Sequence, residues 1–104
     1  MALEKILWTQ TAVRQRRHIF RYWNKRNKNS DYSKKLLIKI KEIISIVRKF
    51  PEIGTNVDFD NTRRVTFGNF SIYYKQSGNT IFITAFWDNR QDPEKLLKLL
   101  EEGL

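Results

Sequence analysis

The sequence predicts an α+β fold with the element order β-α-α-β-β-β. A helical hairpin is expected to pack on one face of a small antiparallel-type sheet, followed by a short C-terminal helix. Apolar residues recur every three or four positions over 31–49, the period of an amphipathic helix. From residue 62 the period changes to two, and β-branched and aromatic residues become frequent. Short turns such as Gly68-Asn69 separate these strands. All 104 residues are expected to form one domain.

The N-terminal part predicts a strand over 3–8, a short apolar run, and then a helix over about 10–27. Thr9 stands between them as a helix N-cap, because its hydroxyl can accept a hydrogen bond from a free amide of the first turn. A polar turn at 27–30 ends the helix. The cations on its polar faces are Arg14, Arg16, Arg17, Arg21, Lys25 and Arg26.

A second helix is predicted to run to about Lys49, with Ser30 or Asp31 as its cap. Pro51 ends it, because a proline disfavours the helical conformation in the preceding residue. The apolar stripe of this helix consists of Leu36, Ile40, Ile43, Val47 and Phe50, widened by Leu37 and Ile44. Two helices joined by so short a turn form an antiparallel hairpin, and their apolar sides must be buried.

Three strands are predicted after a loop at about 51–61, and they form an antiparallel meander. They cover 62–67, 70–76 and 80–86. Asp92 and Pro93 then begin a short helix as its N-cap and first residue. Because the hairpin covers one face of the sheet, the other face is expected to remain free for water or a ligand. Function is therefore expected on that second face.

Composition limits the possible functions. The net charge is +9, distributed as +11 over residues 1–50 and −2 over residues 51–104. This asymmetry fits a polyanionic partner or a well-solvated basic helical layer. The chain has no cysteine and a single histidine, which excludes disulfides, thiolate metal sites and multi-histidine sites within one chain. No metal, cofactor or membrane is expected, and the apolar runs and N-terminus predict a cytoplasmic protein.

Five short motifs occur in a characteristic order along nearly the whole chain. They are Leu7-Trp8-Thr9 with Ala12, Phe50-Pro51-Glu52-Ile53-Gly54, Arg63-Arg64-Val65, Gly68-Asn69-Phe70-Ser71-Ile72-Tyr73-Tyr74, and Phe86-Trp87-Asp88-Asn89-Arg90-Gln91-Asp92-Pro93. With the element order, they resemble the RelE/ParE superfamily, the toxins of type II toxin–antitoxin systems, which include plasmid stabilisation proteins. The resemblance implies growth inhibition and a cognate antitoxin as partner.

The superfamily has two activities on one scaffold, so the resemblance leaves the target open. RelE-like members are ribosome-dependent endonucleases that cut messenger RNA. ParE-like members are poisons of DNA gyrase that do not cut nucleic acid themselves. The implied target is therefore either DNA gyrase or the ribosome with its mRNA. A third interpretation is a non-toxic module that binds nucleic acid.

Residues needed for RNA cleavage are partly missing. Such cleavage needs a base, an acid and cations on the phosphate. RelE-like enzymes place an arginine in the third strand and a tyrosine or histidine late in the chain. Here Ser71 replaces that arginine, His18 lies in the first helix, and no tyrosine follows Tyr74. This favours a ParE-like protein. The metal-independent endonuclease, as the alternative, would use Arg64, Arg90, Tyr74 and Asp88 for catalysis.

Binding of a target or a phosphate is predicted for Arg63, Arg64, Arg90 and Trp87. Strand alternation sends Arg63 and Arg64 to opposite faces of the sheet. Arg90 matches the late arginine of the superfamily. It can bind a phosphate or a partner carboxylate, or pair with Asp88 or Asp92 and fix the turn into the last helix.

Aromatic residues are numerous for so small a sheet. Phe70, Tyr73, Phe86 and Trp87 can stack on the bases of a single strand or belong to the core and the antitoxin-binding surface. The second interpretation is favoured, because buried aromatic residues more often serve packing.

Overall fold

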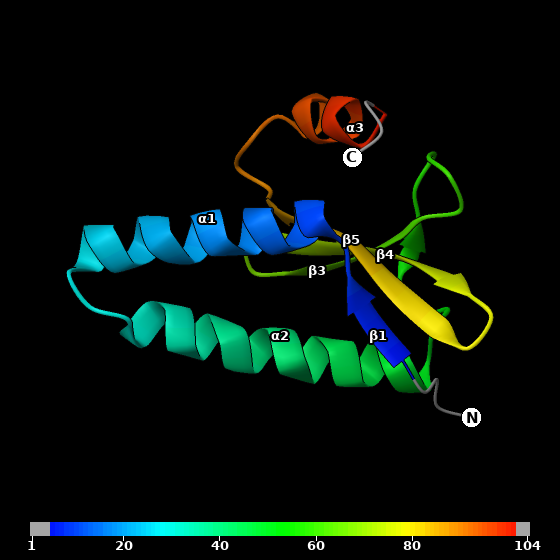
Figure 1. Cartoon of the computed structure of the whole chain (residues 1–104), viewed down its shortest axis with the longest axis horizontal. Coiled ribbons are helices and arrows are strands. Elements are labelled where there is room, and N and C mark those ends of the chain that lie inside the picture. The colour runs from blue at the N-terminus through cyan, green and yellow to red at the C-terminus, as the bar shows by residue number, and fades with distance from the viewer. Residues whose placement is uncertain (1–4, 102–104) are drawn as a thin grey trace.

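The computed structural model describes residues 5–101, without the side chains of 93, 97, 99 and 101. Its elements are β1 (Lys5–Trp8), α1 (Gln10–Asn27), α2 (Asp31–Lys49), β2 (Thr55–Asn56), β3 (Arg63–Phe67), β4 (Phe70–Ser77), β5 (Thr80–Asp88) and α3 (Pro93–Glu101). The predicted α+β order is confirmed, with one strand added. Figure 1 shows α1 and α2 side by side as a hairpin, with the sheet beside it and α3 on the other side of α1 from α2.

Local sequence signals explain where the hairpin helices begin and end. Thr9 is the N-cap of α1, and its hydroxyl accepts a hydrogen bond from the Ala12 amide at 3.2 Å. Ser30 is the N-cap residue of α2, one of the two expected positions, but its side chain makes no capping hydrogen bond. The side chain of Asn29 instead accepts a hydrogen bond from the Asp31 amide at 3.1 Å. α2 ends two residues before Pro51, as predicted.

The sheet has five strands in the order β1-β5-β4-β3-β2. The pairs β2–β3, β3–β4 and β4–β5 are antiparallel, whereas β1 pairs parallel with β5. The sheet is therefore mixed. The short strand β2 lies inside the segment 51–61, which the sequence predicts as a loop. Two residues are too few to show a strand period, and only their pairing with Arg63 and Arg64 defines the strand.

The main core lies between the hairpin and one face of the sheet. Its buried residues are Ala12, Ile19, Leu36, Ile40, Val47, Phe70, Ile72, Tyr74, Ile81, Ile83 and Phe86. Three polar contacts join the start of α1 to β5. The Thr9 amide donates to the Ile83 carbonyl, the Thr9 hydroxyl donates to the Thr84 carbonyl, and the Gln15 side chain accepts from the Phe86 amide. Phe70 and Phe86 therefore belong to the core, as favoured from sequence.

A second cluster covers part of the opposite face of the sheet. Leu96 of α3 packs there against Tyr73, Ala85 and Trp87, each of which is buried, and Leu100 adds to the contact. The expectation of a free second face is therefore wrong over this area. The physical reason is that α3 is amphipathic and buries its apolar side on the nearest uncovered apolar surface. Within residues 5–101, no helix is sufficiently long and apolar to span a bilayer.

Candidate functional site: two arginine pockets

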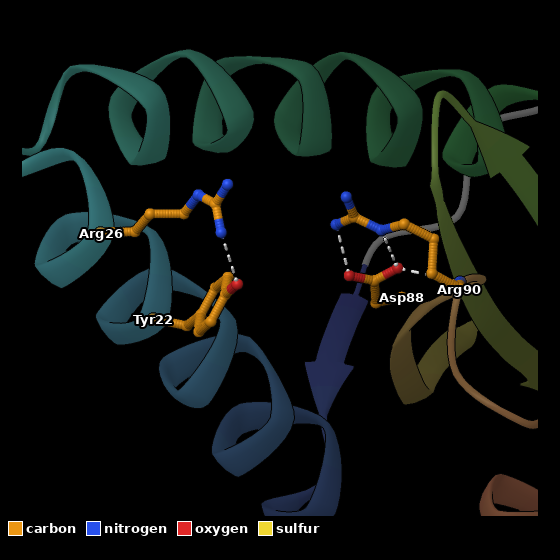
Figure 2. Close-up of polar contacts among 4 residues, drawn as sticks. All are labelled: Tyr22, Arg26, Asp88 and Arg90. Atoms are coloured by element: carbon orange, nitrogen blue, oxygen red, sulfur yellow. Dashed lines mark hydrogen bonds and ion pairs between the residues drawn. The ribbon is translucent and has the colours of Figure 1, made fainter.

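The first pocket, here called the Arg90 pocket, lies between α1 and the end of β5. Arg90 binds Asp88 with both arms of its guanidinium group, Nε to Oδ1 at 2.8 Å and Nη2 to Oδ2 at 2.6 Å (Figure 2). The Arg90 amide also donates to Asp88 Oδ1, at 3.0 Å. Of the three roles open to Arg90, the pairing with Asp88 is thus present in the structure. Asp92 instead accepts from the Glu94 amide and caps α3, as predicted.

Aromatic side chains form one wall of the Arg90 pocket. The Cζ atoms of Arg90 and Arg26 lie 5.3 and 5.7 Å from the Trp23 ring centroid, within the range of a cation–π interaction. Arg26 also donates to the Tyr22 hydroxyl at 3.2 Å. The side chains of Arg26 and Arg90 extend toward one another (Figure 2). The pocket has a volume of about 420 Å³ and is lined by His18, Ile19, Tyr22, Trp23, Asp88, Arg90 and Gln91.

In the Arg90 pocket, the positive charge of Arg90 is neutralised by the carboxylate of Asp88. The hydrogen bonds from Arg90 lower the pKa of Asp88, and burial of the carboxyl opposes this effect only in part. The same hydrogen bonds raise the pKa of Arg90. Arg90 therefore remains a cation and Asp88 an anion throughout the physiological pH range. A second cation, Arg26, lies over the same Trp23 ring and has only the neutral Tyr22 hydroxyl as its hydrogen-bond partner among the described residues.

The second pocket, here called the Arg64 pocket, lies on the opposite face of the sheet, in the part that α3 leaves uncovered. It has a volume of about 330 Å³ and is lined by Arg64, Thr66, Ser71, Tyr73, Trp87, Asn89 and Gln91. Ser71 is buried at its floor and donates to Asn89 Oδ1 at 2.9 Å, while its oxygen lies 3.0 Å from Thr66 Oγ1. Arg64 and Trp87, both predicted to bind a target, therefore share this pocket.

Arg63 and Tyr74 form a third group with a structural role. The Tyr74 hydroxyl donates to the Pro51 carbonyl at 2.8 Å and accepts from the Gly54 amide at 2.9 Å. Arg63 Nη1 donates to the carbonyls of Glu52 and Gly54, at 3.0 and 2.8 Å. Burial raises the pKa of Tyr74, although the Gly54 bond and the nearby Arg63 charge oppose it. Both side chains fasten the segment before β2 to the sheet.

The six residues predicted from sequence therefore do not form one site. Asp88 pairs with Phe70 in the sheet, and Tyr74 lies four residues further along β4, roughly 13 Å at 3.3 Å per residue. Arg63 and Arg64 lie on opposite faces, as predicted. Sequence reasoning missed Arg26 and Asn89. The spacing of Tyr22 and Arg26, one turn apart on α1, was the available sequence signal for Arg26.

No cluster of three or more histidine, aspartate or glutamate side chains that could hold a metal ion occurs among the described residues. The Arg90 pocket is lined by the Arg90–Asp88 ion pair, by His18 and by aromatic and amide groups, and the Arg64 pocket by arginine, hydroxyl, amide and aromatic groups. Arginine and aromatic groups can bind anions and planar surfaces by hydrogen bonding and stacking.

A small basic chain with this strand order, a helical hairpin on one face and arginines at the sheet rim belongs to the class of RelE/ParE-like toxins. The family model for the ParE toxin of the type II toxin–antitoxin system parDE matches residues 6–93, and the chain belongs to that family. The solved structure of the chromosomal ParDE toxin–antitoxin system from P. aeruginosa contains a similar fold. It has a TM-score of 0.56 and 18% identity, over 81% of this chain and 94% of that chain. No curated protein sequence matches.

Proposed function

We propose that this type II toxin inhibits growth by binding DNA gyrase and that it does not cut nucleic acid. A cognate antitoxin neutralises it by direct binding in the cytoplasm. The whole chain acts as one toxin domain. The Arg90 pocket is the surface that we assign to the target, because it combines Arg90 with aromatic surface from Tyr22 and Trp23, and because Arg26 stacks on the same Trp23 ring.

The positions of the candidate proton-transfer groups support binding over cleavage. A ribonuclease needs a base and an acid on either side of one phosphate. The Tyr74 hydroxyl already bonds to two backbone groups, and the Asp88 carboxylate is held by Arg90. The backbone positions that carry the two groups are also separated by four residues along β4, roughly 13 Å at 3.3 Å per residue. This separation is the observation on which the proposal mainly rests.

Brief induction of the chain in a bacterial host tests the proposal. The expected result is growth arrest with an SOS response, and gyrase–DNA cleavage complexes that accumulate with purified protein. Transcript sequencing in the same cells is expected to show no new cuts within codons. Codon-positioned mRNA cuts would instead establish the RelE-like endonuclease. Unaffected growth with a well-expressed chain would contradict both kinds of toxin and leave a non-toxic nucleic-acid-binding module.

Replacing Arg90 tests the assignment of its pocket. We expect Arg90→Ala to weaken gyrase inhibition by about tenfold or more, since arginines that become buried at the centre of an interface often contribute over about 1.4 kcal/mol to binding. The fold is expected to survive, because the Arg90 side chain is half exposed. Arg21→Ala removes the same charge from an exposed position outside both pockets and serves as the control. Full inhibition by a well-folded Arg90→Ala variant would exclude Arg90 from the target surface.

A further inference from the structure

The Arg64 pocket differs from the Arg90 pocket in its charge balance. Arg90 is neutralised by Asp88, whereas no aspartate or glutamate lines the Arg64 pocket. Arg64 is half-buried and makes no hydrogen bond or ion pair within residues 5–101. A half-buried cation without a counter-ion has lost part of its hydration and gains strongly from an anion placed beside it. From this imbalance, we propose that the Arg64 pocket binds a phosphate group.

The polar network at the floor of the pocket orients a second donor. Ser71 has a single hydroxyl proton, which it donates to Asn89 Oδ1. Its oxygen must therefore accept the proton of Thr66 at 3.0 Å. In this chain of hydrogen bonds, Thr66 donates to Ser71 and Ser71 donates to Asn89. The side-chain carbonyl oxygen of Asn89 is therefore turned toward Ser71. The Asn89 amide nitrogen then remains as a donor, and it has no acceptor among the described residues.

Further donors surround the same space. Tyr73 and Gln91, whose side chains end in a hydroxyl and an amide, line the pocket. The indole Nε1 of Trp87, which also lines it, is buried and has no hydrogen-bond acceptor among the described residues. Trp87 is only 6% exposed, so its position is fixed by packing. The lining is thus rich in unsatisfied donors, and a ligand that fits must supply several acceptor oxygens.

A phosphate satisfies this arrangement better than a carboxylate. The donors come from β3, β4, β5 and the segment after β5, and so they approach the pocket from different directions. A tetrahedral phosphate offers oxygens in several directions, whereas a carboxylate has two oxygens in one plane. The phosphate can come from a nucleic-acid backbone or from solution, and the inference holds whether or not gyrase is the target.

Titration of the purified full-length chain with inorganic phosphate, followed by ¹⁵N NMR, tests this inference. Saturable shifts are expected in the Trp87 indole and the Asn89 and Gln91 side-chain amides. Arg64→Gln should weaken phosphate binding by about tenfold or more, and Arg64→Lys should recover part of the loss. Asn89→Asp preserves the shape of the side chain but adds a negative charge that repels phosphate, so it should weaken phosphate binding at least as strongly as Arg64→Gln does. Arg21→Gln is the control for loss of one positive charge.

The source of the phosphate is distinguished by a second titration with a short DNA duplex. If the backbone supplies it, the duplex shifts the same pocket signals and inorganic phosphate competes for them. If only inorganic phosphate shifts them, the pocket takes the free ion. The inference is overturned if neither ligand shifts the pocket signals, or if Arg64→Gln and Arg21→Gln weaken binding equally. Neither result depends on toxicity, so a failure of the gyrase proposal would be seen separately.

Discussion

A single hydroxyl group, that of Tyr74, joins two backbone groups of the segment before β2 to the core. We expect Tyr74→Phe to lower the free energy of unfolding by about 1–3 kcal/mol, because the Gly54 amide and Pro51 carbonyl lose their partner. Urea denaturation measures this loss. The control is Tyr22→Phe, whose hydroxyl is exposed, with an expected change within about 0.5 kcal/mol.

The same Tyr74 variant bears on the mechanism. If the hydroxyl is structural, folded Tyr74→Phe protein inhibits growth as wild type does at a temperature where both are folded. A stable Tyr74→Phe variant that has lost all toxicity would contradict the structural role and point to proton transfer by this group.

Asp88 gives the molecule an acid-sensitive contact. Because Arg90 lowers the pKa of Asp88 in the folded state, ionised Asp88 stabilises the fold above its unfolded pKa, near 3.9. That contribution disappears as the pH falls through the lower, folded pKa. We therefore expect the stability difference between wild type and Asp88→Asn to be constant from pH 7 to about 5 and to shrink below about pH 4. Denaturation from pH 7 to 2 measures it, and a difference independent of pH would refute the coupling.

Which partner an arginine selects is poorly predictable from sequence. Arg90 could bind a phosphate, a partner carboxylate, or the nearby Asp88 or Asp92. The structure pairs it with Asp88 because the two residues flank the end of β5 and their side chains turn to the same face of the sheet. Sequence spacing does not reveal this choice, since it depends on backbone geometry beyond the strand.

At the scale of elements, periodic segments were predictable and short ones were not. Both hairpin helices begin and end near the expected residues, because long apolar periods, a threonine cap and a proline all agree. β2 carries no such signal. The position of α3 was also missed, because its apolar period shows that one side is buried but not which surface buries it.

Close approach at Gly54 ties the segment before β2 to the sheet. A methyl group at this position would lie 2.6 Å from the Tyr74 hydroxyl oxygen and 3.0 Å from the Arg63 Cβ atom. We expect Gly54→Ala to lower the free energy of unfolding by about 1–3 kcal/mol, because the added methyl group overpacks this contact. Gly78→Ala is the comparison: it meets no atom within 4 Å, and only its positive φ is unfavourable, by roughly 1 kcal/mol. Unfolding by urea ranks the two, and equal or reversed costs would contradict the close contact.

Docking of α3 depends on one buried leucine. Leu96 is 1% exposed and packs on Tyr73, Ala85 and Trp87. Leu96→Ala is expected to weaken the packing of α3 by about 2–4 kcal/mol of free energy and so to release this helix from the sheet, since Leu→Ala changes in cores cost amounts of this order. Limited proteolysis should then cut within 89–101 before the rest of the chain. Lys98→Ala, at an exposed position of the same helix, should leave the cleavage pattern unchanged; protection of α3 in the Leu96 variant would show that it is held otherwise.

At the scale of the whole molecule, charge is concentrated in the hairpin. α1 and α2 together contain twelve Lys/Arg and two Asp/Glu, a net +10, so the remainder of the chain is close to neutral. This helical layer dominates the field that an approaching partner meets, and it favours acidic partners on that side. The asymmetry was visible in sequence, because the two helices follow one another along the chain.

The candidate site was predictable as a set of residues but not as a geometry. Sequence motifs selected Arg64, Arg90 and Trp87, and the structure divides them between two faces. Alternation along β5 predicts that Trp87 and Asp88 lie on opposite faces of the sheet. The positions of Arg26 near Arg90 and of Asn89 beside Ser71 become visible only in the three-dimensional structure. Family membership was recognisable from sequence because many weak motifs kept their order.

The parallel pairing of β1 with β5 has a consequence during protein synthesis. β1 has its one strand neighbour in the described sheet among residues 80–83, so a long stretch of chain must be made between the two partners. Until those residues emerge from the ribosome, β1 cannot pair. Asp88 and Arg90 are translated after them, and the Arg90 pocket therefore forms only when both sides of the sheet's parallel edge have been made.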